Sequence, residues 1–418
     1  MEMKPRLNLE KSLALYEEAK KLSPGGLMGI RRPYNFVDGE YPVFIDHGYD
    51  GHIVDVDGND YIDMLCAYGP IILGYNEDEI NEEVKKQMDK GFCFSMVQDV
   101  QNTLQKKLIE LIPSAEMAVL CKTGSDATSI AVRIARGHSE KNKILRCGYH
   151  GWHDWCVENP GGVPEAIQNL TVEFHYADLE DLETKLKEND GDVACIIITP
   201  VGHPLAAPVV EPPKGYLEGV RALADKYGVI LIFDEIRTGF RCALGGAQER
   251  YGVTPDMSVF GKAMANGYPI SACVGKADIM KAMEKKVFVS STFFPNSLEM
   301  VAALKCIEIL ERDNVIDYVY EMGERFLKGQ DDLLKKYNVG ASSSGIPPMP
   351  FITFEKVDGN YKERRKRFYT ETIRRGLFIQ PYHHGYICFR HTEADIEKAL
   401  NIIEEALQVI AEVYPVEG

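Results

Sequence analysis

Two short apolar runs, each followed at once by a chemically active residue, constrain the fold of this chain most. Residues 229–233 (VILIF) precede Asp234, and residues 257–260 (MSVF) precede Gly261 and Lys262. An apolar run without alternation indicates a strand covered on both faces, as in a parallel sheet. Because ligands bind at the carboxyl edge of such sheets, Asp234 and Lys262 are expected at a binding site.

A carboxylate and an amine at this edge suit one cofactor in particular. A lysine amine forms a Schiff base with the aldehyde of pyridoxal 5′-phosphate, and a carboxylate keeps the pyridine nitrogen protonated so that the ring accepts electrons. The pair therefore favours Lys262 and Asp234 as catalytic residues. Taken singly, each has an ordinary alternative, because lysines are mostly exposed and Asp at a strand end commonly forms a turn.

An upstream segment has the features of an anion site. The apolar run 117–121 leads into residues 122–128 (KTGSDAT) and then into a helical pattern over 129–136. A strand, a glycine turn and a helix start together expose unpaired N–H groups at the positive end of a helix dipole, where the cofactor phosphate is expected. By itself such a turn is usually an ordinary cap. The next strand, 143–146, ends shortly before Tyr149, whose ring could stack on the cofactor.

The order and spacing of these segments resemble the class III, ornithine aminotransferase-like family of fold type I pyridoxal-phosphate enzymes. The resemblance is strongest to the glutamate-1-semialdehyde aminomutase-like branch. It covers residues from about 12 to 410 and includes TGSDAT at 123–128, YHGWHD at 149–154, FDEIRTGFR at 233–241 and STFFPN at 291–296. It implies an α/β fold in which a large domain has a mostly parallel sheet covered by helices. A small α+β domain would be built from both chain ends.

The patterns of apolar residues place the domains. Residues 1–65 are expected to form an N-terminal segment that joins the small domain, residues 66–296 the large cofactor-binding domain, and residues 297–418 the C-terminal small domain. In the middle range, short apolar strands alternate with helical segments, which is typical of a parallel sheet with helices on both faces. The segment 297–336 has helical spacing, and an amphipathic helix is predicted from about 393 to 413.

Carried onto this chain, the resemblance assigns the ring contacts of the cofactor. Lys262 would be the Schiff-base lysine, and Asp234 would partner the pyridine nitrogen. Ile236 and Tyr149 would press on opposite faces of the ring.

The resemblance also assigns the phosphate contacts. Gly124 and Ser125 would hold the phosphate, and Thr292 would reach the phosphate bound in the neighbouring subunit. A homodimer with shared active sites is therefore implied. His203 stands where the family usually has an Asn near the phenolic oxygen of the cofactor, and it is the candidate cofactor-binding residue at that position.

Three residues are candidates for substrate binding. Arg32 matches the position where aminomutases and some β-amino-acid aminotransferases hold the substrate carboxylate, and a guanidinium suits such a bidentate contact. A surface arginine is the alternative. Arg237 replaces the Met common in the aminomutases and adds positive charge to the pocket. Trp152 falls in a segment that forms a gating loop in the aminomutases, with a packing residue as the alternative.

Two departures from the aminomutases favour a transferase that acts between separate molecules. Residues 381–392 lack the Phe-Glu pair of the aminomutases, and Met28 stands in place of their serine. The expected enzyme is an aminotransferase with a keto-acid acceptor. Its donor would be a small amino acid or a β-amino compound, such as a β-amino acid or a β-aminoacyl thioester like 3-aminobutyryl-CoA. A glutamate-1-semialdehyde-type 2,1-aminomutase and a non-catalytic homologue that acts as a binding protein remain alternatives.

Composition narrows the partners and the compartment. A net charge of −16 argues against nucleic-acid binding, and the sequence has no run of about eighteen apolar residues that would span a membrane. The ten cysteines include no C-x-x-C pair. They predict reduced thiols in the cytoplasm, without a metal site. The first residues also lack the pattern of an export signal.

Overall fold

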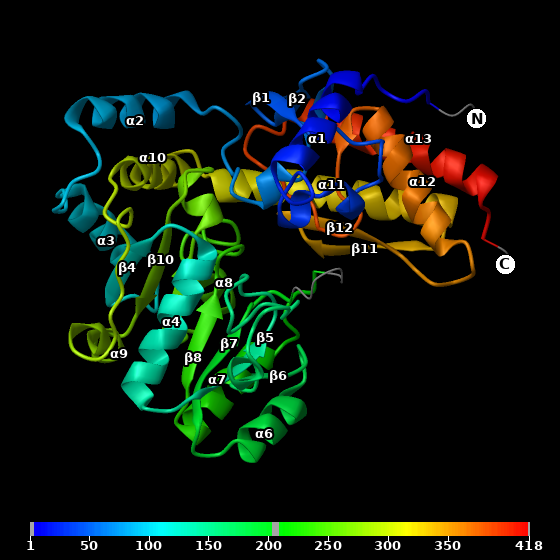
Figure 1. Cartoon of the computed structure of the whole chain (residues 1–418). Helices are drawn as coiled ribbons and strands as arrows, with labels where there is room; N and C mark the ends of the chain where they lie inside the picture. Colours follow the sequence, from blue (N-terminus) through cyan, green and yellow to red (C-terminus); the bar gives the residue numbers. More distant parts are fainter. Residues whose placement is uncertain (1–3, 203–208, 417–418) are drawn as a thin grey trace. The chain divides into compact units, whose positions relative to one another are not determined.

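The computed structural model describes residues 4–202 and 209–416, which form two compact units (Figure 1). The larger unit contains residues 78–202 and 211–316. The smaller unit contains residues 4–77, 209–210 and 317–416.

These divisions differ from the predicted domain limits at two places. Residues 66–77 belong with the smaller unit, where Asp50 and Tyr75 form a β-bridge. Residues 297–316 belong with the larger unit, because helix α10 (Leu298–Arg312) packs against helices α2 (Asp78–Lys90) and α3 (Val100–Leu111).

The larger unit is built on a seven-stranded sheet in the order β4-β10-β9-β8-β7-β5-β6. Strand β10 runs antiparallel to both neighbours, and the remaining pairs are parallel, so the sheet is mostly parallel as predicted. The strands are β4 (Met117–Cys121), β5 (Lys143–Cys147), β6 (Thr171–Glu173), β7 (Val193–Ile198), β8 (Ile230–Asp234), β9 (Met257–Phe260) and β10 (Ser271–Gly275).

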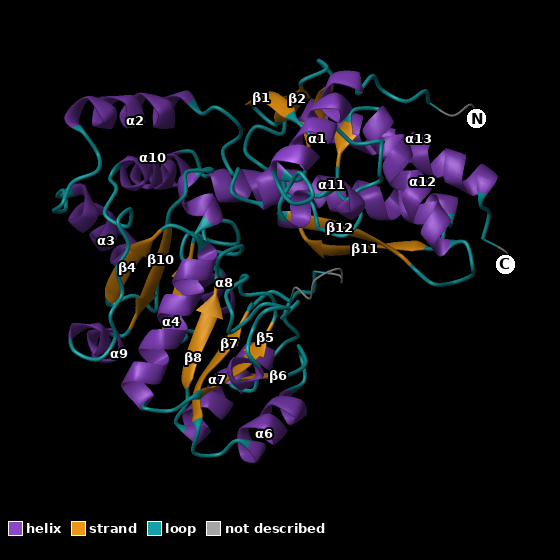
Figure 2. Ribbon diagram, viewed as in Figure 1, coloured by secondary structure: helices purple, strands orange, loops and turns teal. Residues whose placement is uncertain are grey.

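Helices cover both faces of this sheet (Figure 2). Ile197 and Ile232 point into a core shared with helix α4 (Gly124–Ser139). Their neighbours Ile198 and Phe233 point into the opposite core, shared with helices α6 (Leu179–Glu188) and α7 (Tyr216–Tyr227). Burial on both faces explains why these strands are continuously apolar. The remaining helices are α5 (Glu165–Gln168), α8 (Ala247–Tyr251), α9 (Ala277–Met280), η4 (Lys262–Ala265) and η5 (Lys281–Glu284).

The smaller unit combines both chain ends, as the resemblance implied. Its four-stranded sheet has the order β1-β2-β3-β13, and the C-terminal strand β13 pairs in parallel with the N-terminal strand β3. The strands are β1 (Ile45–Tyr49), β2 (His52–Asp55), β3 (Asp60–Asp63) and β13 (Leu377–Phe378), with a separate hairpin of β11 (Ala341–Ile346) and β12 (Met349–Phe354). The helices are α1 (Glu10–Leu22), η1 (Gly29–Arg31), η2 (Pro33–Asn35), η3 (Cys66–Tyr68), α11 (Val315–Tyr337, which begins in the larger unit), α12 (Tyr361–Arg374) and α13 (Glu393–Val413). No helix within the described ranges has the length and apolar character needed to cross a membrane.

Candidate active site

The predicted phosphate site lies at the start of α4, directly after β4. Thr123 caps the helix: its Oγ1 accepts the N–H of Asp126 at 3.1 Å, and the Asp126 carboxylate accepts the N–H of Thr123 at 2.8 Å. Among the residues that the structure describes, no acceptor faces the N–H groups of Gly124 and Ser125. They lie at the positive end of a helix of 16 residues, an arrangement that binds anions.

The turn that follows β5 packs on the same helix start. Gly151 has a φ of +115°, and a Cβ at this position would collide with Ser125, so the close approach requires glycine. Thr128 Oγ1 donates a hydrogen bond to the carbonyl oxygen of His150 at 2.8 Å. Tyr149 stays 41% exposed on this turn, although burial of the rest of the residue raises the pKa of its phenol. The turn therefore packs on the predicted phosphate site and leaves part of Tyr149 accessible.

Asp234 is the last residue of β8, and only 5% of its surface is exposed. Its Oδ2 accepts a hydrogen bond from His150 Nδ1 at 2.8 Å, and its Oδ1 accepts the N–H of Ile236 at 3.1 Å. The buried His150 ring stacks beside Trp155, with centroids 6.1 Å apart and planes 14° apart. These contacts fix the orientation of the carboxylate. The amino-acid order gives no signal for the His150 contact, because the two residues lie 84 positions apart in the sequence.

The side chain of Ile236 brings three loops together. An ideal Cβ built at Gly124 or at Gly261 would lie 3.2 Å from Ile236 Cδ1. The turns after β4 and β9 thus both pack against the residue that follows β8. Glycine at both positions leaves room for Ile236, and the predicted phosphate site, Asp234 and the start of η4 are drawn to one edge of the sheet.

Lys262 begins η4 with a φ of +46°, a left-handed conformation that is strained for a residue with a Cβ. Burial of the amine lowers its pKa to about 7. The positive charges of Arg237 and Arg241 also lower this pKa, whereas the negative charge of Asp234 raises it. A large fraction of the amine is therefore neutral near pH 7. A neutral amine is the form that attacks a carbonyl carbon.

The segment after β8 contains a buried acid that the resemblance did not single out. Glu235 is fully buried, and burial raises its pKa. Its carboxylate accepts hydrogen bonds from Thr238 Oγ1, from the N–H of Ala247 at 2.8 Å and from the N–H of Gln248 at 3.0 Å. Glu235 thus ties the turn that carries Arg237 to the start of α8.

The other predicted residues differ in their surroundings. Thr292 is exposed in the larger unit and has no interaction with the cluster among the described residues. Trp152 is 69% exposed, and its backbone N–H donates to Ser125 Oγ at 3.4 Å. Arg32 belongs to the smaller unit, where its Nε donates to the carbonyl oxygen of Leu27 at 2.9 Å. His203 lies outside the described residues.

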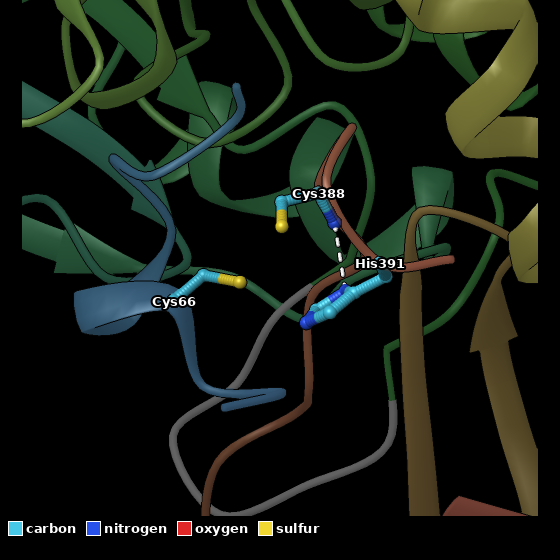
Figure 3. A group of neighbouring side chains, drawn as sticks. All are labelled: Cys66, Cys388 and His391. Atoms are coloured by element: carbon cyan, nitrogen blue, oxygen red, sulfur yellow. Dashed lines mark hydrogen bonds between the residues drawn. The ribbon is translucent and has the colours of Figure 1, made fainter. Parts of the chain in front are cut away.

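The smaller unit holds a separate buried group, Cys66, Cys388 and His391, whose side-chain atoms lie within 4.8 Å of one another (Figure 3). Two thiols and an imidazole are ligands that zinc prefers. Both ring nitrogens of His391 are already engaged, however: Nδ1 accepts the N–H of Cys388 at 3.1 Å, and Nε2 donates to the carbonyl oxygen of Asp63 at 3.1 Å. The ring also packs directly on Gly51. His391 therefore has a structural role that links the end of β3 to the segment before α13.

Comparisons with known proteins agree with this architecture. The sequence model of the class-III aminotransferases matches residues 35–407. The chain is 58% identical over 407 residues to 3-aminobutyryl-CoA aminotransferase of Cloacimonas acidaminovorans (strain Evry), covering 97% of this chain and 98% of that protein. It is 35% identical to glutamate-1-semialdehyde 2,1-aminomutase of Methanothrix thermoacetophila, covering 94% and 96% of the two chains. The PLP internal aldimine form of FumI from Sphingopyxis sp. MTA144 superposes with a TM-score of 0.91 at 27% identity, covering 96% of each chain.

The fold and the comparisons define a fold type I enzyme whose cofactor is pyridoxal 5′-phosphate. The chain belongs to the class-III aminotransferase family. The predicted fold class, cofactor and enzyme class are confirmed.

Proposed function

We propose that this enzyme moves the amino group of 3-aminobutyryl-CoA, or of a closely similar β-aminoacyl thioester, to a 2-oxo acid. The observation that carries the proposal is the identity of 58% with the Cloacimonas 3-aminobutyryl-CoA aminotransferase over nearly the whole length of both chains. The aminomutases are less similar, at 32% to 35% identity. An intramolecular aminomutase is the second candidate, and it would turn over without net consumption of a keto acid.

The larger unit offers the groups that pyridoxal phosphate requires. When bound, the cofactor supplies a carbonyl carbon that joins the substrate nitrogen and a ring that takes up electrons from the substrate carbon. The N–H groups of Gly124 and Ser125 suit its phosphate, because no acceptor within the described chain occupies them. The buried Asp234 carboxylate suits the protonated ring nitrogen. Tyr149 and Ile236 are the proposed contacts of the two ring faces.

Lys262 is the proposed catalytic base. Its Nζ would hold the cofactor covalently and, once the substrate amine replaces it, would move a proton between the substrate carbon and the cofactor. A pKa of about 7 suits both tasks, because the base must be neutral to accept the proton and must release it again. The buried environment and the positive charge of Arg237 produce this pKa.

His150 is a positioning residue for Asp234, and we expect His150→Phe to lower kcat/KM by roughly 10- to 100-fold. The substitution removes the Nδ1–H donor from a buried carboxylate, to which hydrogen bonds contribute about 1.5–3 kcal/mol. Steady-state kinetics measure the loss, and His153→Phe in the next turn is the matched control. Unchanged kinetics together with an unchanged absorbance spectrum of the bound cofactor would show that Asp234 does not depend on His150.

The proposed assembly is a homodimer in which Thr292 contacts the cofactor phosphate of the neighbouring subunit. Exposed apolar side chains in two segments of the larger unit support it: Phe94, Met96 and Val97 in one, and Phe288 and Phe293 in the other. The two segments are held together where the N–H of Ser297 donates to the carbonyl oxygen of Phe92 at 3.1 Å. Large exposed apolar patches mark interaction sites. We expect sedimentation velocity at micromolar concentration to show a dimer. Finding only monomers would refute the proposed assembly.

Arg32 and Trp152 are retained as proposed substrate residues. Arg32 uses its Nε–H, and an Nη2–H at 3.3 Å, to hold the carbonyl oxygens of Leu27 and Pro24, so its remaining N–H groups are the ones offered to a substrate. Trp152 offers a large exposed ring next to Ser125. Such a ring suits a contact with an incoming substrate.

A cytoplasmic location is also proposed. All ten cysteines are free thiols, and nine of them are buried. Free thiols in this number suit a reducing compartment.

A half-reaction screen tests the proposed substrate. The purified holoenzyme is mixed with 3-aminobutyryl-CoA, 3-aminobutyrate, β-alanine or glutamate-1-semialdehyde without any acceptor, and the absorbance of the cofactor is followed. We expect the CoA thioester to react fastest. A faster reaction with a free amino acid, or turnover of glutamate-1-semialdehyde without net consumption of a keto acid, would refute the proposal.

A further inference from the structure

We propose that Arg237 binds the carboxylate of the 2-oxo acid acceptor and has no such role toward the thioester donor. This inference deepens the proposed function, on which it rests for the identity of the donor. It assigns one residue to one half of the reaction.

The backbone places Arg237 beside Lys262. The N–H of Glu235 donates to the carbonyl oxygen of Val259 at 2.9 Å, Ile236 packs on Gly261, and Gly239 packs directly on the ring of Phe260. The turn that begins at Glu235 therefore runs along the end of β9, immediately before Lys262.

Backbone hydrogen bonds hold the turn that carries Arg237. The N–H of Gly239 donates to the carbonyl oxygen of Glu235 at 2.8 Å, and the N–H of Cys242 donates to that of Thr238 at 2.8 Å. Arg237 itself is buried, with 8% of its surface exposed. The positive charge of Arg237 lowers the pKa of the Lys262 amine.

Charged side chains of both signs act on the Lys262 amine. The negative charge of Asp234 raises the pKa of the amine, whereas the positive charges of Arg237 and Arg241 lower it. A buried guanidinium is matched best by a carboxylate, which it can hold through paired hydrogen bonds. The phosphate of the cofactor is expected elsewhere, at the start of α4.

Only one of the two substrates has a group that the Arg237 guanidinium would bind. A β-aminoacyl thioester has no carboxylate next to its reacting amine, whereas a 2-oxo acid has one directly bonded to its reacting carbon. In the acceptor half-reaction, the keto carbon gains the amine nitrogen and two electrons. The aminomethyl carbon of the cofactor is oxidised to the aldehyde, and the keto oxygen leaves as water while water supplies the aldehyde oxygen. A fixed guanidinium would orient the keto acid for this exchange.

Separate half-reactions test the assignment. The enzyme is loaded with pyridoxamine 5′-phosphate, and the return of the aldehyde absorbance is followed after adding pyruvate or 2-oxoglutarate. We expect Arg237→Gln to slow this step by about 100-fold, because one charge of a desolvated pair is lost. Arg237→Lys should recover part of the rate. Propanal, a carbonyl compound without a carboxylate, reports any effect of the Arg237 charge on Lys262, and its loss with Arg237→Gln should be at least about tenfold smaller than the loss with keto acids.

Two further measurements separate a binding role from a structural one. Calorimetry with glutarate, which has carboxylates but no carbonyl to react, should show weaker binding to Arg237→Gln. The donor half-reaction with 3-aminobutyryl-CoA reports any effect of the Arg237 charge on Lys262, and its loss should be at least about tenfold smaller than the loss with keto acids. Arg312→Gln, which loses an exposed arginine paired with Glu79 and Asp313, is the matched control.

The outcomes distinguish this inference from the proposed function. Equal losses with keto acids and propanal, or unchanged keto-acid rates, would overturn the assignment of Arg237. A wild-type enzyme that ignores 3-aminobutyryl-CoA would overturn the proposed donor, and the keto-acid result with the preloaded cofactor would stand.

Discussion

Lys262→Ala is expected to abolish turnover, with a loss of at least about 10⁴-fold in kcat. The variant lacks both the amine that holds the cofactor and the base that moves the proton. The cofactor should still bind through its phosphate, because the start of α4 is unchanged. Borohydride reduction of the wild-type holoenzyme, followed by peptide mass spectrometry, should find the cofactor on the peptide that contains Lys262.

A matched control and the pH dependence sharpen this prediction. Lys122→Ala removes another lysine of the larger unit, one paired with Glu299 at 3.1 Å, and should leave the covalent attachment intact.

Because burial lowers the pKa of Lys262 to about 7, the rate at which added cofactor attaches to apoenzyme should rise as the pH rises through about 7. Label on any other lysine would contradict the assignment.

Sequence patterns predict the strands well where both faces of the sheet are buried. The apolar runs 117–121 and 257–260 coincide with β4 and β9, and 229–233 is displaced by only one residue from β8 (Ile230–Asp234). Such runs have a simple physical cause in the central strands β7 and β8, where successive side chains enter one core or the other. The antiparallel direction of β10 has no comparable signal, because a fully buried strand is apolar in either direction.

Helix limits were harder to predict than strands. The segment 297–336 has continuous helical spacing, yet the structure divides it into α10 and α11. The break lies at Asn314, whose φ is +49°, a left-handed conformation that Asn adopts more readily than most residues. The two compact units divide shortly after this break, so the predicted limit at residue 297 came earlier in the chain than the observed one.

The sequence predicts only those residues of the candidate site that directly follow a recognisable strand pattern. Asp234, Lys262 and Gly124 each follow a recognisable strand, and the sheet brings the ends of these strands to one edge. The contact of Asp234 with His150, and that of Ile236 with two glycine turns, depend on side chains from separate loops. Their existence follows from packing, which a single sequence does not display.

Asp234→Asn is expected to retain the cofactor and to lower kcat by about 10³-fold or more. The isosteric amide keeps the shape of the site and can still accept the hydrogen bond from His150. It carries no negative charge to stabilise a protonated ring nitrogen in buried surroundings, so the ring becomes a weaker acceptor of electrons. Stopped-flow measurement of the donor half-reaction reports this step directly.

A modified cofactor separates charge from position in the Asp234→Asn variant. Pyridoxal phosphate methylated on its ring nitrogen carries a permanent positive charge, so it needs no carboxylate to keep that nitrogen charged. If Asp234 acts by stabilising the charge, the methylated cofactor should restore part of the lost rate in the variant and should give wild type no such gain. The exposed Asp154→Asn is the isosteric control and should behave as wild type with either cofactor. Near-normal turnover of Asp234→Asn with the natural cofactor would mean that another residue partners the ring nitrogen, and His150, already in contact with Asp234, would be the first to examine.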